Sequence, residues 1–103
     1  MASPMRIRAK TTDGITEVKA LMSHPMETGM RKDAEGKPIP AHYITEVTAT
    51  HNDKLVLHAY WGPAVSQNPF LNFQFKGGAA GDTVTIKWVD NLGESQTEQA
   101  TLS

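Results

Sequence analysis

The sequence predicts an all-β protein in which about seven antiparallel strands form a sandwich. Three observations support this fold class: short segments alternate hydrophobic and polar residues, turn-forming residues separate those segments, and no stretch has a convincing helical period. Seven short strands in 103 residues are typical of an immunoglobulin-like β-sandwich, although the paired cysteines of antibody domains are missing here. A small barrel is the structural alternative.

The first three strands are expected in the N-terminal half of the chain. Residues 5–9 alternate hydrophobic side chains with two arginines, and Asp13 and Gly14 form the next turn. Residues 15–22 divide into two faces, one of which carries both charged side chains. Residues 43–50 (YITEVTAT) are rich in β-branched residues, which pack well on a pleated sheet.

Four more strands are expected in the C-terminal half. Residues 54–61 (KLVLHAYW) form a mostly apolar run, which predicts a central strand. Residues 70–76 place three hydrophobic side chains on one face, and residues 83–89 alternate most cleanly, with Val84, Ile86 and Trp88 directed inward. A last strand is expected at about 95–102.

Composition restricts the function classes. The length fits one domain spanning residues 1–103, and the absence of cysteine excludes disulfides, thiolate metal sites and a cysteine nucleophile. Ten basic and eleven acidic residues give a net charge of −1, without the basic surplus of nucleic-acid-binding modules. No stretch approaches the ~18 apolar residues of a membrane span. The N-terminus has no apolar run, so no signal peptide is expected.

Residues 23–42 (SHPMETGMRKDAEGKPIPAH) do not follow the strand pattern. The segment contains three prolines, two glycines and six charged residues, but no aromatic residue. Connections longer than ~12–15 residues are uncommon in compact domains and are often functional. Part of the segment is expected to fold as a hairpin, with Asp33, Ala34, Glu35 and Gly36 as its turn.

Two interpretations of the histidine and methionine residues remain open. His24, Met26 and Met30 have the soft ligands of a Cu(I) site. The favoured interpretation is that Met22, Met26 and Met30 fill gaps in the core and at its rim. The four histidines have no zinc-site spacing, and no nucleophile with a matching base is apparent. We therefore expect no catalytic residue, no cofactor and no metal site.

Arg31, Lys32 and Asp33 form the strongest charge cluster of the chain. On the residues alone, a solvated hairpin tip is favoured over a docking surface, because exposed ion pairs contribute little. Arginine is nevertheless favoured at protein interfaces, where it binds carboxylates bidentately. The residues alone thus indicate a cysteine-free β-sandwich that binds a partner.

Three segments resemble a known family. They are residues 24–40 (HPMETGMRKDAEGKPIP), 64–70 (AVSQNPF) and 81–93 (GDTVTIKWVDNLG). Together they closely resemble SoxZ, the small subunit of the SoxYZ carrier complex of bacterial thiosulfate oxidation. The similarity runs from about residue 5 to the end of the chain.

The resemblance implies an immunoglobulin-like scaffold subunit that is not an enzyme. It implies a heterodimer with the Y subunit, whose C-terminal cysteine arm carries covalent sulfur intermediates. The pathway cytochrome, the hydrolase and the sulfane dehydrogenase would be transient partners. The complex would be periplasmic, and this chain would be exported together with the Y subunit, which carries the Tat signal. No nucleic acid and no membrane are expected as partners.

The expected Y-facing surface combines the long connection with residues 63–69. Its candidate partner-binding residues are His24, Met26, Glu27, Arg31, Lys32 and Asp33. A sandwich face that the partner normally covers would favour self-association of the isolated chain. The alternative function is a periplasmic copper-binding β-sandwich that uses the methionine and histidine side chains of this connection.

Overall fold

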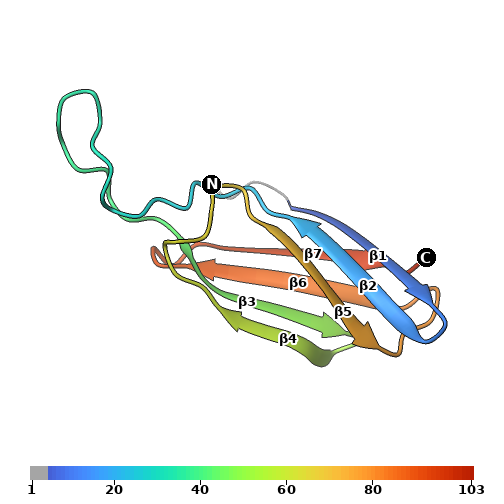
Figure 1. Cartoon of the computed structure of the whole chain (residues 1–103). Helices are drawn as coiled ribbons and strands as arrows, with labels where there is room; N and C mark the ends of the chain where they lie inside the picture. The colour runs from blue at the N-terminus through green and yellow to red at the C-terminus, as the bar shows by residue number, and fades with distance from the viewer. Residues whose placement is uncertain (1–4) are drawn as a thin grey trace.

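The computed structural model describes residues 5–103, which form seven strands in two antiparallel sheets (Figure 1). The strands are β1 (Arg6–Thr12), β2 (Ile15–Leu21), β3 (Ile44–His51), β4 (Lys54–Tyr60), β5 (Phe70–Lys76), β6 (Thr83–Asp90) and β7 (Ser95–Thr101). The smaller sheet has the order β1-β2-β5, and the larger has the order β4-β3-β6-β7. The described residues contain no helix. The predicted all-β immunoglobulin-like sandwich is confirmed.

The core lies between the two sheets and is built by alternate residues of the strands. Val84, Ile86 and Trp88 of β6 are fully or almost fully buried, as their alternation predicted. They pack in one hydrophobic cluster with Val18 of β2 and Val47 of β3. Trp88 is the largest fully buried side chain among the described residues.

The first strand is longer than predicted. It continues to Thr12, which pairs with Ile15 across the turn, whereas the sequence predicted an end at residue 9. The added residues Lys10, Thr11 and Thr12 are polar, so they gave no hydrophobic alternation to read. Pairing with β2 extends the strand, because each added residue pairs with a residue of β2 in the antiparallel ladder.

The prediction of a central strand at residues 54–61 was wrong. β4 lies at the edge of the larger sheet and pairs with β3 alone. Its apolar residues lie along a side of the sandwich where the core is only partly covered: Val56 and Leu57 pack against the core, and Leu55 is exposed. On the other side of the sandwich, the C-terminus reaches β1, because Ser103 exchanges backbone hydrogen bonds of 3.2 Å with Ala9 and Thr11.

Gly78 fits a position that no other residue can occupy without strain. Its φ is +99°, and a Cβ there would lie 2.2 Å from Oγ1 of buried Thr16. That hydroxyl already donates a hydrogen bond of 2.8 Å to the carbonyl of Gly77. Gly78→Ala should therefore lower the free energy of unfolding by about 2–4 kcal/mol, measured by urea denaturation.

Gly77→Ala is the matched control for that prediction. Gly77 has a similar φ of +104°, but a Cβ there would have nothing within 4 Å. Gly77→Ala should therefore lower the free energy of unfolding by only about 1–2 kcal/mol, the cost of holding a side chain at positive φ. Equal losses in the two variants would show that the steric contact with Thr16 has no role.

Candidate functional site

The connection between β2 and β3 projects from one end of the sandwich (Figure 1). We call its residues 23–42 the arm. The molecule is consequently elongated, with principal extents of 54 × 20 × 20 Å. Two isolated β-bridges join the sides of the arm, one between Glu27 and His42 and one between Lys32 and Pro38. The arm is thus a narrow antiparallel ribbon.

The tip of the arm is the turn that the sequence predicted. The amide of Gly36 donates to the carbonyl of Asp33 at 3.0 Å, and the amide of Asp33 donates to the carbonyl of Lys37 at 2.9 Å. The Asp33 carboxylate also accepts the amides of Glu35 and Lys37, at 2.9 and 3.0 Å. Asp33 therefore stabilises the turn through its own backbone and side chain.

The base of the arm is fixed by His24, which is 4% exposed. Its amide donates to Oδ1 of Asn68 at 3.1 Å, and its carbonyl accepts the Asn68 amide at 2.9 Å. The amide of Met22 donates to the carbonyl of Pro69 at 3.0 Å. These bonds hold the start of the arm against the segment that leads into β5.

The Asp90 carboxylate, at the end of β6, collects four hydrogen bonds. Oδ2 lies 3.0 Å from Nε2 of His24 and 2.8 Å from Nε2 of His42. Oδ1 accepts the amides of Leu92 and Glu94, at 3.0 and 2.8 Å. Asp90 is 3% exposed, so this buried carboxylate links both ends of the arm to the turn between β6 and β7.

The proton positions of His24 follow from its two partners. The amide of Met26 donates to Nδ1 of His24 at 3.1 Å, so Nδ1 carries no proton. The proton of the neutral ring is then on Nε2, which donates to Asp90. A metal ion at Nε2 would require the opposite tautomer and would set two donors against each other at Nδ1.

This tautomer decides how the group formed by His24, His42 and Asp90 is interpreted. Their candidate ligand atoms lie within 4.8 Å of one another, as a metal site requires. Nε2 of His42 also lies 3.1 Å from Oε2 of Glu94. We interpret the group as a hydrogen-bond network that anchors the arm, and call it the anchor cluster. No local pattern indicates this cluster, because Asp90 is 66 residues from His24 and 48 residues from His42.

The pKa of Asp90 is lower than its ordinary value. Burial alone raises that pKa, but hydrogen bonds from His24, His42 and the backbone amides of Glu94 and Leu92 together outweigh burial. The ionised carboxylate is therefore the form that the folded protein stabilises. Its contribution to stability is complete above the ordinary pKa of 3.8 and is lost as the pH falls through the lowered value.

Acidification should therefore weaken the wild-type fold more than it weakens Asp90→Asn. Urea unfolding of both proteins between pH ~6 and ~3 measures this, and the difference between their stabilities should shrink as the pH falls. The comparison isolates Asp90 from other carboxylates with a lowered pKa, such as Glu27 and Asp82. Parallel pH profiles for the two proteins would contradict the prediction.

The three candidate copper ligands, His24, Met26 and Met30, differ in burial and in hydrogen bonding. Both ring nitrogens of His24 are engaged, and the sulfur of Met26 accepts the amide of Ile44 at 3.4 Å. Met30 is 87% exposed on the arm. Met22 and Met26 belong to the core, which confirms the favoured interpretation for these two, whereas Met30 does not. The structure gives no support to a copper site of these three side chains.

A groove lies between the base of the arm and the connection from β4 to β5. It has a volume of about 380 Å³. One wall consists of Pro25, Met26, Glu27, Thr28 and Arg31, and the other consists of residues 63–67. Arg31 and Glu27 form a bidentate ion pair beside it, with Nε of Arg31 donating to Oε2 of Glu27 at 2.9 Å. This pair lowers the pKa of Glu27 chiefly through the hydrogen bond.

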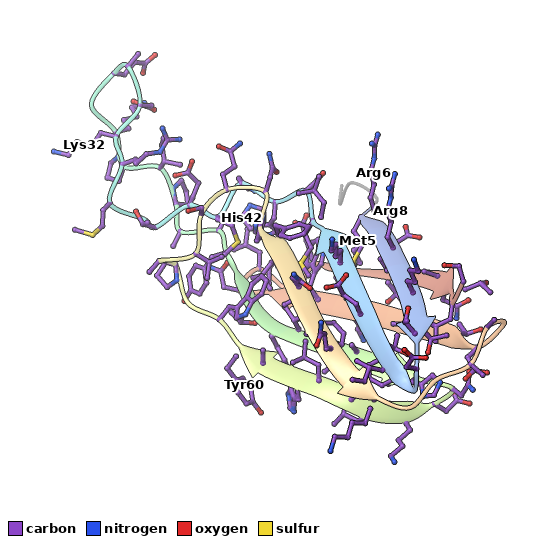
Figure 2. The ribbon with its side chains drawn as sticks, turned by 45° about the vertical axis from the view of Figure 1, so that its right-hand side comes forward. Met5, Arg6, Arg8, Lys32, His42 and Tyr60 are labelled. Carbon is purple, nitrogen blue, oxygen red and sulfur yellow. The ribbon has the colours of Figure 1, made fainter. Side chains whose placement is uncertain are left out.

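The six predicted partner-binding residues fall into three groups. Glu27 and Arg31 line the groove. Lys32 and Asp33 are exposed near the tip of the arm, where Figure 2 shows Lys32 directed away from the sandwich. His24 and Met26 are buried. The enclosed ring of His24 offers no contact surface, whereas Met26 is part of one wall of the groove. Contact of the other residues with a partner stays a prediction.

The family comparison agrees with these motifs. A family model described as sulphur oxidation protein SoxZ matches residues 5–101. The chain belongs to the SoxZ family. Its membership makes it a subunit of a sulfur-oxidation system of the Sox type. A search of curated proteins found no match. In the described residues of this SoxZ-family chain, no helix is long and apolar enough to cross a membrane.

Proposed function

We propose that this SoxZ-family chain is the non-catalytic scaffold subunit of a periplasmic sulfur carrier. Its partner is the Y subunit, whose C-terminal cysteine arm carries sulfur intermediates during thiosulfate oxidation. The pathway cytochrome, hydrolase and sulfane dehydrogenase act on the cargo of that complex. The chain is exported with the Y subunit, which supplies the Tat signal.

One observation carries the proposal: the three segments that resemble SoxZ converge on one site. Residues 24–40 supply one wall of the groove, and residues 64–70 supply most of the other. Residues 81–93 contain Trp88 and Asp90, which pack against and hydrogen-bond to the base of the arm. Segments distant in sequence thus form one site, in which two segments line the groove and the third supports the arm from inside. The site contains no cysteine.

The composition of this surface suits a carrier that uses a thiol. Thiolates attack disulfides and related sulfur bonds, so a second thiol near the cargo would divert it. The chain has no cysteine. The lining of its groove instead includes prolines, together with an arginine and a glutamate that form an ion pair with each other. The scaffold can therefore lie against a loaded cysteine arm without exchanging with it.

Arg31→Ala should weaken Y-subunit binding by about tenfold, because it removes the guanidinium that lines the groove and leaves Glu27 without its partner. Titration calorimetry with the purified Y subunit measures this. Lys37→Ala is the matched control, because Lys37 is an exposed cation of the same arm but does not line the groove. Unchanged affinity for Arg31→Ala, or equal losses in both variants, would reject the groove as the Y-binding site.

A further inference from the structure

The outer face of the smaller sheet is a second surface with a definite composition. The register places its twelve side chains in four rows across β1, β2 and β5. The rows are Arg6, Leu21 and Phe70; Arg8, Lys19 and Asn72; Lys10, Glu17 and Gln74; and Thr12, Ile15 and Lys76. Figure 2 shows Arg6 and Arg8 extending from this face into solvent.

This face concentrates positive charge. It carries Arg6, Arg8, Lys10, Lys19 and Lys76, which are five of the ten basic residues of the chain, against the single acidic residue Glu17. The formal charge of the face is therefore +4, although the whole chain has a net charge of −1. On the outer face of the larger sheet, by contrast, Lys87 is balanced by Glu46.

One cross-strand pair of this face is not explained by stability, although Lys10 lies opposite Glu17. Arg8 lies directly opposite Lys19 on neighbouring strands. Like charges in such cross-strand pairs destabilise a sheet. Lys19 has an ion-pair contact with Glu17 at 3.7 Å, whereas Arg6, Arg8, Lys10 and Lys76 have none within the described part of the chain. The face thus keeps unneutralised charge at a cost to the fold.

A shallow groove runs along this face to the C-terminus. It has a volume of about 430 Å³, and its walls include Arg8, Lys10 and Lys19. Thr101 and Ser103 complete it at the edge of the sheet, and Glu17 is the single acidic residue in its lining. The three cations outnumber the one carboxylate, and arginine and lysine side chains are suitable donors for the carboxylates of a partner.

We infer that the outer face of β1, β2 and β5 docks an acidic surface of another protein. Leu21 and Phe70 are exposed apolar neighbours of Arg6, and such a combination of apolar and arginine side chains is typical of protein interfaces. A nucleic acid fits less well, because the net charge is negative and Phe70 is the only aromatic residue on the face. This docking face lies on the sheet and not in the arm groove, so the inference does not rest on the proposed function.

The direct test is an NMR titration of the full ¹⁵N-labelled chain with short poly-L-glutamate. Amide shifts should cluster on β1 and β2, and the apparent affinity should fall as salt rises, because the Debye length shortens. Arg8→Glu combined with Lys19→Glu should weaken binding by at least about tenfold. The matched control combines Lys54→Glu and Lys87→Glu, which make the same charge change on the larger sheet, and should retain the site-specific shifts.

Each other outcome counts against the inference. Shifts spread evenly over both sheets, or equal losses in the control variant, would overturn it. Tighter binding of double-stranded DNA at the same salt would replace the acidic protein with nucleic acid, and equal shifts from inorganic sulfate would reduce the face to a simple anion site. The single variant Arg8→Glu turns the like-charged pair with Lys19 into a pair of opposite charges, so it should fold at least as stably as the wild type. Its affinity for poly-L-glutamate can therefore be compared with that of the wild type without interference from a folding defect.

Discussion

Asp90→Ala should lower the free energy of unfolding by about 3–5 kcal/mol, because it removes a buried ionised partner of two histidines. The Asp90 carboxylate accepts from His24, His42 and two backbone amides. Alanine leaves His24 and the two backbone amides without this acceptor, whereas His42 keeps Oε2 of Glu94 at 3.1 Å. Each buried unsatisfied donor is costly. Urea denaturation followed by far-UV circular dichroism measures the loss.

Asp33→Ala is the matched control for Asp90→Ala. The Asp33 carboxylate also accepts two backbone amides, at 2.9 and 3.0 Å, but it is exposed at the tip of the arm. Water can replace it there, so the loss should stay below about 1 kcal/mol. Similar losses at the two positions would show that the anchor cluster contributes no more than an ordinary turn.

Because the anchor cluster holds the base of the arm, Asp90→Ala should loosen that region first. Hydrogen exchange should accelerate first at the amides of Met26 and Glu27, which are protected by His24 Nδ1 and the His42 carbonyl, respectively. Exchange in β1 should respond less, since the hydrogen bonds of the Asp90 carboxylate go to His24, His42, Leu92 and Glu94 and not to that strand. Loss of protection throughout the sandwich, with no early opening at the arm base, would contradict the anchoring role.

Trp88→Ala should lower the free energy of unfolding by about 3–5 kcal/mol, the range for truncating a buried aromatic residue to alanine. Trp88 is 1% exposed and is the largest buried side chain in the described structure. Its ring also packs edge-on against His24, with centroids 5.0 Å apart. The variant therefore removes both core volume and the wall behind the anchor cluster, and urea denaturation quantifies the total.

Trp88→Phe separates the contribution of core packing at this position from that of the polar indole nitrogen. The indole nitrogen of Trp88 has no hydrogen-bond partner among the described residues. Phenylalanine therefore loses volume but no hydrogen bond, and the loss should be about 1–2 kcal/mol. A loss as large as that of Trp88→Ala would show that the indole nitrogen has a partner in solution.

The sequence predicted those features that depend on local pattern. Alternation, β-branched residues and one apolar run located the seven strands, and the composition of residues 33–36 located the turn of the arm. The edge position of β4 was not predictable, because an apolar run does not show whether a strand has one neighbour or two. The length of β1 depended on pairing of polar residues with β2.

The site was predictable only in part, for a related reason. The arm and residues 63–69 were expected to form one surface, and they do form the two walls of a groove. The anchor cluster depends on contacts between residues 48 and 66 positions apart, which no local spacing encodes. Similarly, the basic face emerges only when the strand register places Arg8 beside Lys19, since the net charge of −1 conceals it.

We propose that this cysteine-free chain is the scaffold of a two-subunit sulfur carrier. Native mass spectrometry tests this function after co-expression with a Tat-signalled protein from the same genome that ends in a glycine-flanked cysteine. We predict a complex of one copy of each chain, and after supply of thiosulfate to the reconstituted pathway, sulfur adducts on the partner alone. Two separate chains under these conditions, or adducts on this chain, would show that it is not such a scaffold.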